Sequence, residues 1–104
     1  MIEIKKLYSD ENADLLKVLE FIKDSHKIGI GAIQRGCEMG YGRVARYIDL
    51  MIDAGLVQNP HKYHMVIGMD GKKHRRYLPN ELVATDEELQ YCITELKQKV
   101  GNNK

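Results

Sequence analysis

Arg43 and Arg46 are the residues best placed for chemistry, in the stretch GYGRVARYIDLMIDAGLV, residues 40 to 57. Their spacing puts both guanidinium groups on one side of a helix, one turn apart. A guanidinium near the N-terminal end of a helix can donate to O6 and N7 of guanine in the major groove. The sequence therefore predicts a DNA contact for Arg43. For Arg46, a phosphate contact and an ion pair with Asp49 or Asp53 are equal alternatives.

Further basic and polar candidates lie on either side of this stretch. Arg35 is expected near the phosphate backbone, where contacts position a protein without specifying sequence. The phenol of Tyr41 could donate to a phosphate or pack against the preceding helix. Lys72, Lys73 and Arg75 lie at the tip and on the return strand of a predicted β-hairpin. Because side chains alternate along a strand, Arg75 and the arginine after it point to opposite faces, so at most one of them is expected to face DNA.

The chain offers little for metal or covalent chemistry. His61, His64 and His74 have no carboxylate or thiol pair beside them in the sequence, which is a weak pattern for a metal site. Cys37 and Cys92 fall on apolar faces and are expected to be reduced core residues. No grouping combines a nucleophile, a base and an orienting residue, and the phosphate-binding motif GxxxxGK[ST] is absent. We therefore expect no enzymatic activity, no cofactor and no metal.

Several elements must position these side chains. Hydrophobic periodicity and turn residues predict helices over residues 13 to 24 and 32 to 39, a third helix ending at Gly55, strands over 63 to 67 and 74 to 78, and a C-terminal helix over 85 to 100. Asn12 is available as the first N-cap, and Thr85-Asp-Glu-Glu88 is a capping box. Residues 27 to 31 suit a brief strand or an extended connector. The fold class is α+β, a winged helix-turn-helix with three N-terminal helices, a β-hairpin wing and an extra C-terminal helix.

The third helix and the C-terminal helix both carry apolar faces. Val44, Ile48, Met51 and Ile52 are expected inward on the third helix. Tyr47 and Ile52 suggest that this helix has a further surface to cover, for which the C-terminal stripe is available: Leu89, Cys92, Ile93 and Leu96. Either the C-terminal helix folds back on its own domain, which the width of the stripe favours, or it pairs with a second copy. Monomer and homodimer are both open.

Length and composition fit one domain over residues 1–104, with a core over 12–79. Of the 104 residues, 43% are hydrophobic and 30% are charged, which suffices for a single small core. The net charge of +1 does not by itself indicate nucleic acid or a membrane. Its distribution is uneven, since residues 61 to 77 carry five Lys or Arg against one Asp. No apolar run approaches the length of a membrane span, so a cytoplasmic protein without membrane contact is expected.

Residues 13 to 58 carry a pattern that resembles a known family. The matching positions are Ile33-Gln34-Arg35, Met39-Gly40-Tyr41, Arg43, Ala45, Arg46, Met51 and Gly55-Leu56-Val57. This stretch is similar, without a gap, to the C-terminal gamma domain of the FtsK/SpoIIIE DNA translocases. The family usually has Asn where this chain has Gly42, and a basic or neutral residue where it has Glu38.

The resemblance implies a winged helix that reads short, G-rich sequences of double-stranded DNA with the start of the third helix and the wing. In the family this reading orients a motor, and some members also contact a recombinase. Arg43, Arg46 and Arg35 match the family's helix arginines, and Gly42 stands at a position that would face DNA. The expected function is sequence-specific DNA binding for recruitment, orientation or transcriptional control. The alternative is a protein-interaction winged helix that has lost base-specific reading.

Overall fold

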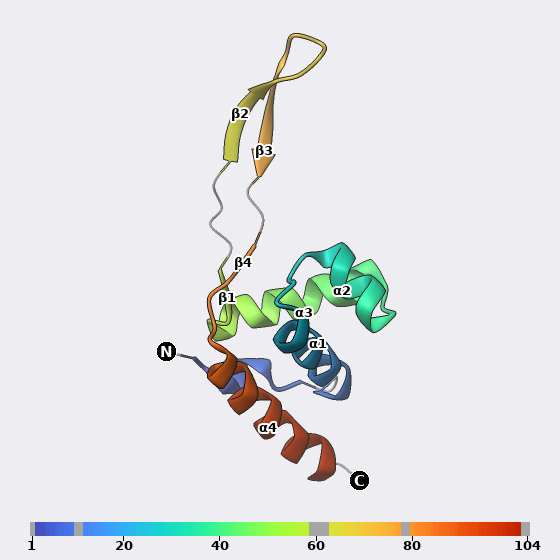
Figure 1. Ribbon diagram of the computed structural model, residues 1–104, viewed down its shortest axis with the longest axis vertical. Coiled ribbons are helices and arrows are strands. Elements are labelled where there is room, and N and C mark those ends of the chain that lie inside the picture. The colour runs from blue at the N-terminus through green and yellow to red at the C-terminus, as the bar shows by residue number, and fades with distance from the viewer. Residues whose placement is uncertain (1, 10–11, 59–62, 78–79, 103–104) are drawn as a thin grey trace.

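The computed structural model describes residues 2–9, 12–58, 63–77 and 80–102, and the fold is α+β, as predicted (Figure 1). The elements in chain order are η1 (Ile4–Leu7), α1 (Asn12–Ser25), α2 (Ile30–Cys37), α3 (Tyr41–Ala54), β1 (Val57–Gln58), β2 (Tyr63–Ile67), β3 (Lys73–Tyr77), β4 (Glu81–Leu82) and α4 (Asp86–Asn102). The strands form two antiparallel pairs, β1 with β4 and β2 with β3. This order is compatible with a winged helix. None of the described helices is both long and apolar enough to cross a membrane.

The core forms where α1 lies between its helical neighbours. On α1 the buried apolar residues follow the helical period: Leu15, Val18, Leu19 and Ile22. The stripe of α4, which the sequence left to either its own domain or a second copy, packs on α1 of the same chain and is buried there. It is therefore not the cover of α3. Instead η1 packs on α3 and contributes the fully buried Leu7, an element that the sequence did not predict.

Local hydrogen bonds explain where α1 and α4 begin. The predicted capping box at α4 is confirmed: the Thr85 N–H donates to Glu88 Oε1 at 2.9 Å, and the Glu88 N–H donates to Thr85 Oγ1 at 3.1 Å. Asn12 was predicted to cap α1, but it lies inside the helix. Its side-chain oxygen accepts a hydrogen bond from the backbone N–H of Ser9 at 2.9 Å, three residues back.

The helices α2 and α3 are joined by the three residues 38–40. The helix α2 starts at Ile30, earlier than predicted, because Gly29 already takes the extended conformation of an N-cap. No strand forms over residues 26–29, so the connector alternative holds.

Glu38 ends α2 in the left-handed region at φ 55°, and the extended Gly40 leads into α3. The Phe21 ring occupies the space where a Cβ at Gly36 would lie, so glycine permits the close approach of α2 to α1.

The end of α3 anchors the base of the hairpin. Gly55 adopts φ 88° and ends the helix as predicted, with the N–H of Leu56 donating to the Met51 carbonyl at 2.9 Å. The chain then enters β1, which pairs with β4. The backbone N–H groups of Val83 and Ala84 both donate to the Leu56 carbonyl, at 3.0 and 3.1 Å. The segments that lead into and out of the hairpin are thus both hydrogen-bonded at the C-terminal end of α3.

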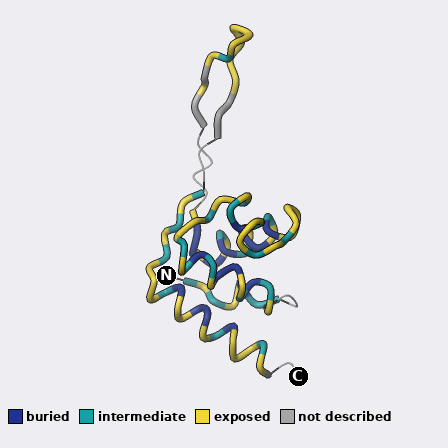
Figure 2. The backbone as a smooth tube through the Cα atoms, turned by 45° about the vertical axis from the view of Figure 1, so that its right-hand side comes forward, coloured by how far each residue is buried: buried dark blue, intermediate teal, exposed yellow. Residues whose placement is uncertain are grey.

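The second strand pair forms a ribbon that projects from the helical body, and the molecule measures 57 × 29 × 22 Å (Figure 1). The register pairs Ile67 with Lys73 and Met65 with Arg75, so β3 starts and ends one residue earlier than predicted. At the turn, the Gly68 N–H donates to the Lys72 carbonyl at 2.9 Å, and Gly71 has φ 77°. The predicted Asp-Gly turn is therefore present, and its tip is exposed (Figure 2).

Candidate nucleic-acid interface

The N-terminal end of α3 presents the predicted residues to solvent. Tyr41, Gly42, Arg43 and Arg46 are all exposed there, and Tyr41 retains 64% of its accessible surface. Packing of the Tyr41 ring against α2 was the alternative, and this exposure does not support it. A Cβ built at Gly42 would meet no atom within 4 Å, so this position opens directly to the surface. The residues on the buried face of α3 hold this end in place: Val44, Tyr47, Ile48 and Met51.

Arg43 has a partner within the protein that the sequence did not indicate. Its guanidinium donates to Asp14 Oδ2 on α1 at 3.0 Å, and the hydroxyl of Tyr47 donates to the same oxygen at 3.3 Å. The Arg43 side chain nevertheless keeps 50% of its surface exposed. A guanidinium carries five N–H donors, so one hydrogen bond to a carboxylate leaves others for a ligand. The contact thus orients Arg43 without occupying all of its donors.

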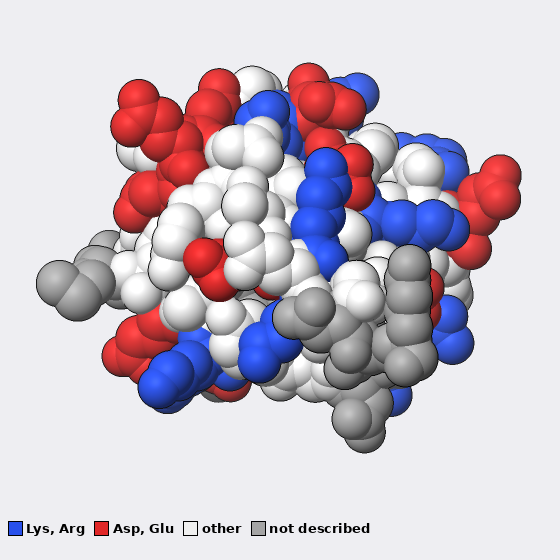
Figure 3. Space-filling model, turned by 90° about the horizontal axis from the view of Figure 1, so that it is seen from below, with Lys and Arg blue, Asp and Glu red and all other residues white. Residues whose placement is uncertain are grey.

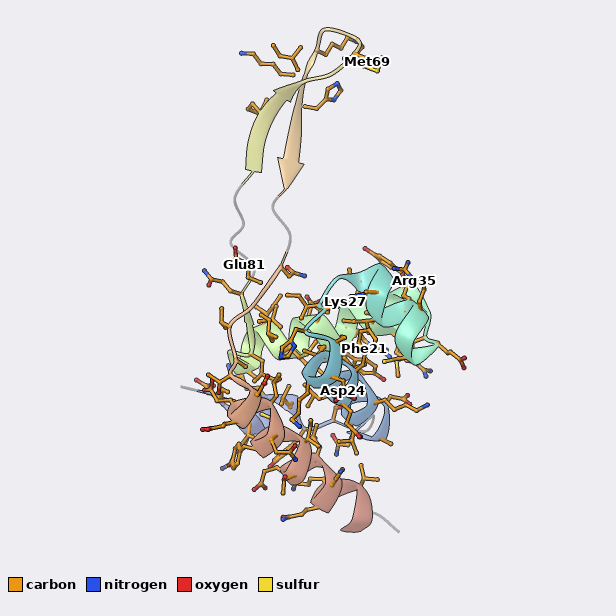
Figure 4. The ribbon with its side chains drawn as sticks, in the orientation of Figure 1. Phe21, Asp24, Lys27, Arg35, Met69 and Glu81 are labelled. Atoms are coloured by element: carbon orange, nitrogen blue, oxygen red, sulfur yellow. The ribbon has the colours of Figure 1, made fainter. Side chains whose placement is uncertain are left out.

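Arg35 and the two hairpin lysines are also exposed. Arg35 lies on the outer surface of α2, with its guanidinium over Gly31 (Figure 4). Lys72 and Lys73 follow the hairpin turn and are exposed. Arg75 lies on β3, but its side chain is outside the described part of the structure. The structure therefore presents the candidates as two groups, one at α2 and α3 and the other on the hairpin.

The length of α3 separates Arg43 from the point where the chain leaves the helical body towards the hairpin. Arg43 is near the first residue of the helix, whereas the hairpin leaves from its last residue through β1. At a rise of 1.5 Å per residue, Arg43 and Ala54 are about 16 Å apart along the axis. Half a turn of B-DNA is about 17 Å. The point where the chain leaves α3 towards the hairpin is therefore about half a DNA turn from Arg43, and the hairpin projects away from the helical body (Figure 1).

Asp70 is the single acidic residue of the hairpin sequence, and it is engaged in the turn. Its Oδ1 accepts the backbone N–H of Lys72 at 2.9 Å and lies 3.1 Å from His74 Nε2. These two hydrogen bonds, the first being the larger cause, hold the pKa of Asp70 below its usual value of 3.8. The carboxylate therefore stabilises the turn that carries Lys72.

Because folding of the turn lowers the pKa of Asp70, its contribution to the hairpin is fully present above the usual pKa and is lost as the pH falls through and below that value. We expect the amide resonances of Gly71 and Lys72 to shift toward unfolded positions over that acidic range, followed by NMR. In Asp70→Asn the acidic transition should disappear. An unchanged transition in that variant would show that another group controls the turn.

The opposite end of the molecule has a different character. Seen from that side, Lys and Arg side chains are intermingled with Asp and Glu, and no surface of one sign extends across it (Figure 3). Burial raises the pKa of both cysteine thiols, that of Cys92 to about 11. Neither thiol is therefore an activated nucleophile. Within the described residues, no three His, Cys, Asp or Glu side chains form a group able to hold a metal ion.

Comparisons with known protein families, curated proteins and solved structures found no match. What the chain does must therefore be argued from its own residues. The described structure defines an α+β protein with two helices joined by a short turn and a projecting basic hairpin. Asp14 of α1 and Tyr47 of α3 join the predicted site residues, because the Asp14 carboxylate accepts hydrogen bonds from both Arg43 and Tyr47.

Proposed function

We propose that this protein is a winged helix that binds double-stranded DNA sequence-specifically. The helices α2 and α3 form its helix-turn-helix, the N-terminal end of α3 enters the major groove, and the hairpin is the wing. The protein works without catalysis or a cofactor. The observation that carries the proposal is the exposed end of α3, where Arg43 is oriented by Asp14 but keeps donors directed to solvent.

Two features support different roles for the α2 and α3 residues and for the hairpin residues. At α3, Arg43 can reach base edges while Arg46 and Arg35 lie near phosphates. On the hairpin, the basic residues outnumber the acidic one, and that carboxylate is already hydrogen-bonded within the turn. Phosphate contacts of this kind supply affinity that is independent of sequence. The hairpin leaves the helical body from the end of α3 opposite to Arg43, so the two groups can contact separate parts of one duplex.

The resemblance of residues 13 to 58 to the FtsK/SpoIIIE gamma domain supports a role in recruitment, orientation or transcriptional control in the cytoplasm. It favours G-rich target sequences, and a DNA translocase or a recombinase as partner. Gly42 replaces the amide that the family usually has at the start of α3. The site recognised by this protein is therefore proposed to differ from the family's own.

The proposal is tested by titrating the protein against a pool of random duplexes and against a G-rich duplex over a series of salt concentrations. We expect selected sequences to emerge from the pool and binding to weaken steeply with salt, because phosphate contacts release counterions. Absence of binding at low salt would overturn the proposal. Equal binding to all sequences would support only electrostatic contact with the DNA backbone and would contradict sequence-specific recognition.

The hairpin lysines give a quantitative prediction within that experiment. The double variant Lys72→Ala/Lys73→Ala should weaken binding to all sequences about equally and reduce the magnitude of the negative slope of log K against log salt by about 2. The matched control is Lys5→Ala/Lys97→Ala, which removes the same charge from η1 and α4. If both variants change the slope alike, net charge and not the hairpin determines the affinity.

A second candidate function is protein binding by a winged helix that no longer reads bases. The ion pair between Arg43 and Asp14 favours it, because a base contact must compete with that carboxylate. Gly42, Glu38 and the net charge of +1 point the same way. The two functions differ in the effect of Arg43→Ala, which should weaken base discrimination in the first and leave partner binding unchanged in the second.

A further inference from the structure

The hairpin exposes large apolar side chains as well as lysines. Met65 and Ile67 on β2 are 54% and 75% exposed, and Met69 in the turn is fully exposed. Met69 lies at the far end of the hairpin from the helical body (Figure 4). Two-stranded hairpins are only marginally stable by themselves, so apolar residues on such a ribbon gain little from their own strands. Exposed apolar groups clustered in this way indicate a binding surface.

Charge decides what this surface can contact. Residues 61 to 77 carry five Lys or Arg against the one hydrogen-bonded Asp70. The register places Ile67 directly opposite Lys73, so an apolar and a cationic side chain share one face of the ribbon. A second copy of the same hairpin would bring like charges together. A polyanion with apolar surface between its charges is the complementary occupant, and stacked base pairs between two phosphate backbones have this character.

We propose, on the basis of the DNA-binding function proposed above, that Met69 and Ile67 form an apolar wedge that enters the minor groove and bends the duplex. Minor-groove proteins that kink DNA insert Ile, Met and similar side chains between base steps, while lysines and arginines contact the flanking phosphates. Met69 is unbranched and stands at the tip, so it reaches furthest. Lys72 and Lys73 follow Met69 in the chain after Asp70 and Gly71, and they engage the flanking phosphates.

Hydrogen bonds fix the backbone of the turn that carries Met69. The Gly68 N–H bonds the Lys72 carbonyl, the Gly71 N–H bonds the Gly68 carbonyl at 3.0 Å, and Asp70 binds the Lys72 N–H. These bonds close the loop immediately around Met69. A turn whose backbone is already ordered loses less conformational entropy when its tip inserts.

The test is a bending measurement on a duplex of about 25 base pairs that carries fluorescence donor and acceptor dyes at its ends and flexible TA steps. Binding is followed in parallel by anisotropy of the same duplex. We expect energy transfer to rise on binding, corresponding to a bend on the order of 20–90°. Met69→Ala and Ile67→Thr should lose most of the bend and much less of the affinity, since the phosphate contacts remain. Val83→Ala, which removes an exposed apolar side chain outside the hairpin, should bend DNA like the parent protein.

The outcomes separate this inference from the proposed function. Binding without bending, or bending that survives both hairpin substitutions, would overturn the wedge and leave DNA binding intact. Loss of bending in Val83→Ala as well would also overturn it, because the effect would not belong to the hairpin. Absence of any binding by the parent protein would overturn the DNA-binding function and the wedge together, and would direct the exposed hairpin to a protein partner.

Discussion

Tyr47→Ala should destabilise the fold by about 3–5 kcal/mol, the usual cost of removing a large buried aromatic side chain. Tyr47 is fully buried on α3 and belongs to the central core with Leu15 and Leu19 of α1. Its removal leaves a cavity beneath the end of α3 that carries Arg43. The loss is measured as the shift of the urea midpoint in equilibrium unfolding, which small single domains undergo as one cooperative transition.

Tyr47→Phe is the matched control because it keeps the ring and removes only the hydroxyl that donates to Asp14 at 3.3 Å. The net contribution of one such hydrogen bond is about 0.5–1.5 kcal/mol, so this variant should be much less destabilised. If the two substitutions cost the same, the hydroxyl network would hold α3 to α1, and the burial of the ring would contribute little. That result would contradict the assignment of Tyr47 to the core.

The parts of this fold that could be predicted are those decided by neighbouring residues. The capping box at Thr85 and Glu88, the glycine that ends α3 at Gly55 and the Asp-Gly turn of the hairpin each rest on residues within four positions of one another. The buried face of α3 followed from its period, as Val44, Ile48 and Met51 show. Local chemistry was sufficient at these positions because tertiary packing agrees with it.

The features that could not be predicted depend on residues far apart in the sequence. The pairing of Val57 with Leu82 joins two strands of two residues each, which carry no periodic signal of their own. The burial of Leu7 depends on the surface of α3 that η1 happens to cover. Tyr47 was interpreted as an apolar group for the C-terminal helix to cover, yet its hydroxyl donates to Asp14 of α1, and α4 packs on α1 instead.

The candidate site likewise combines features that local sequence predicts with features that depend on distant residues. The sequence located the exposed end of α3 and the hairpin lysines, and the structure presents these residues at the surface. It did not identify Asp14, which is 29 residues from Arg43 and becomes its neighbour only when α1 and α3 cross. Asp14 follows the start of α1, where an acidic residue is ordinary for electrostatic reasons. Nothing in its local context distinguished it from a solvated carboxylate.

Arg43→Ala should have little effect on stability and a large effect on DNA recognition. The ion pair with Asp14 is half exposed, and pairs of this kind contribute about 0–1 kcal/mol. A bidentate contact to guanine contributes about 1–3 kcal/mol of discrimination between bases, so the preference for the selected sequence should fall roughly 5- to 150-fold. The measurement is the ratio of affinities for selected and random duplexes. Lys97→Ala, which removes an exposed charge from α4, should leave that ratio unchanged.

The variant Asp14→Ala distinguishes two roles of the carboxylate: it either orients Arg43 for DNA or competes with DNA for Arg43. The variant keeps the charge of Arg43, so binding to random duplexes should persist with its salt dependence, or tighten because a nearby carboxylate is gone. If Asp14 orients the guanidinium, discrimination between sequences should drop toward that of Arg43→Ala, because an arginine held by one hydrogen bond loses less freedom when it forms the next. If discrimination between sequences rises instead, the carboxylate competes with DNA for Arg43. The ion pair in the free protein then weakens the contact of Arg43 with the bases. If neither Asp14→Ala nor Arg43→Ala changes discrimination, the end of α3 does not read bases, and the protein-binding function becomes the better account of this surface.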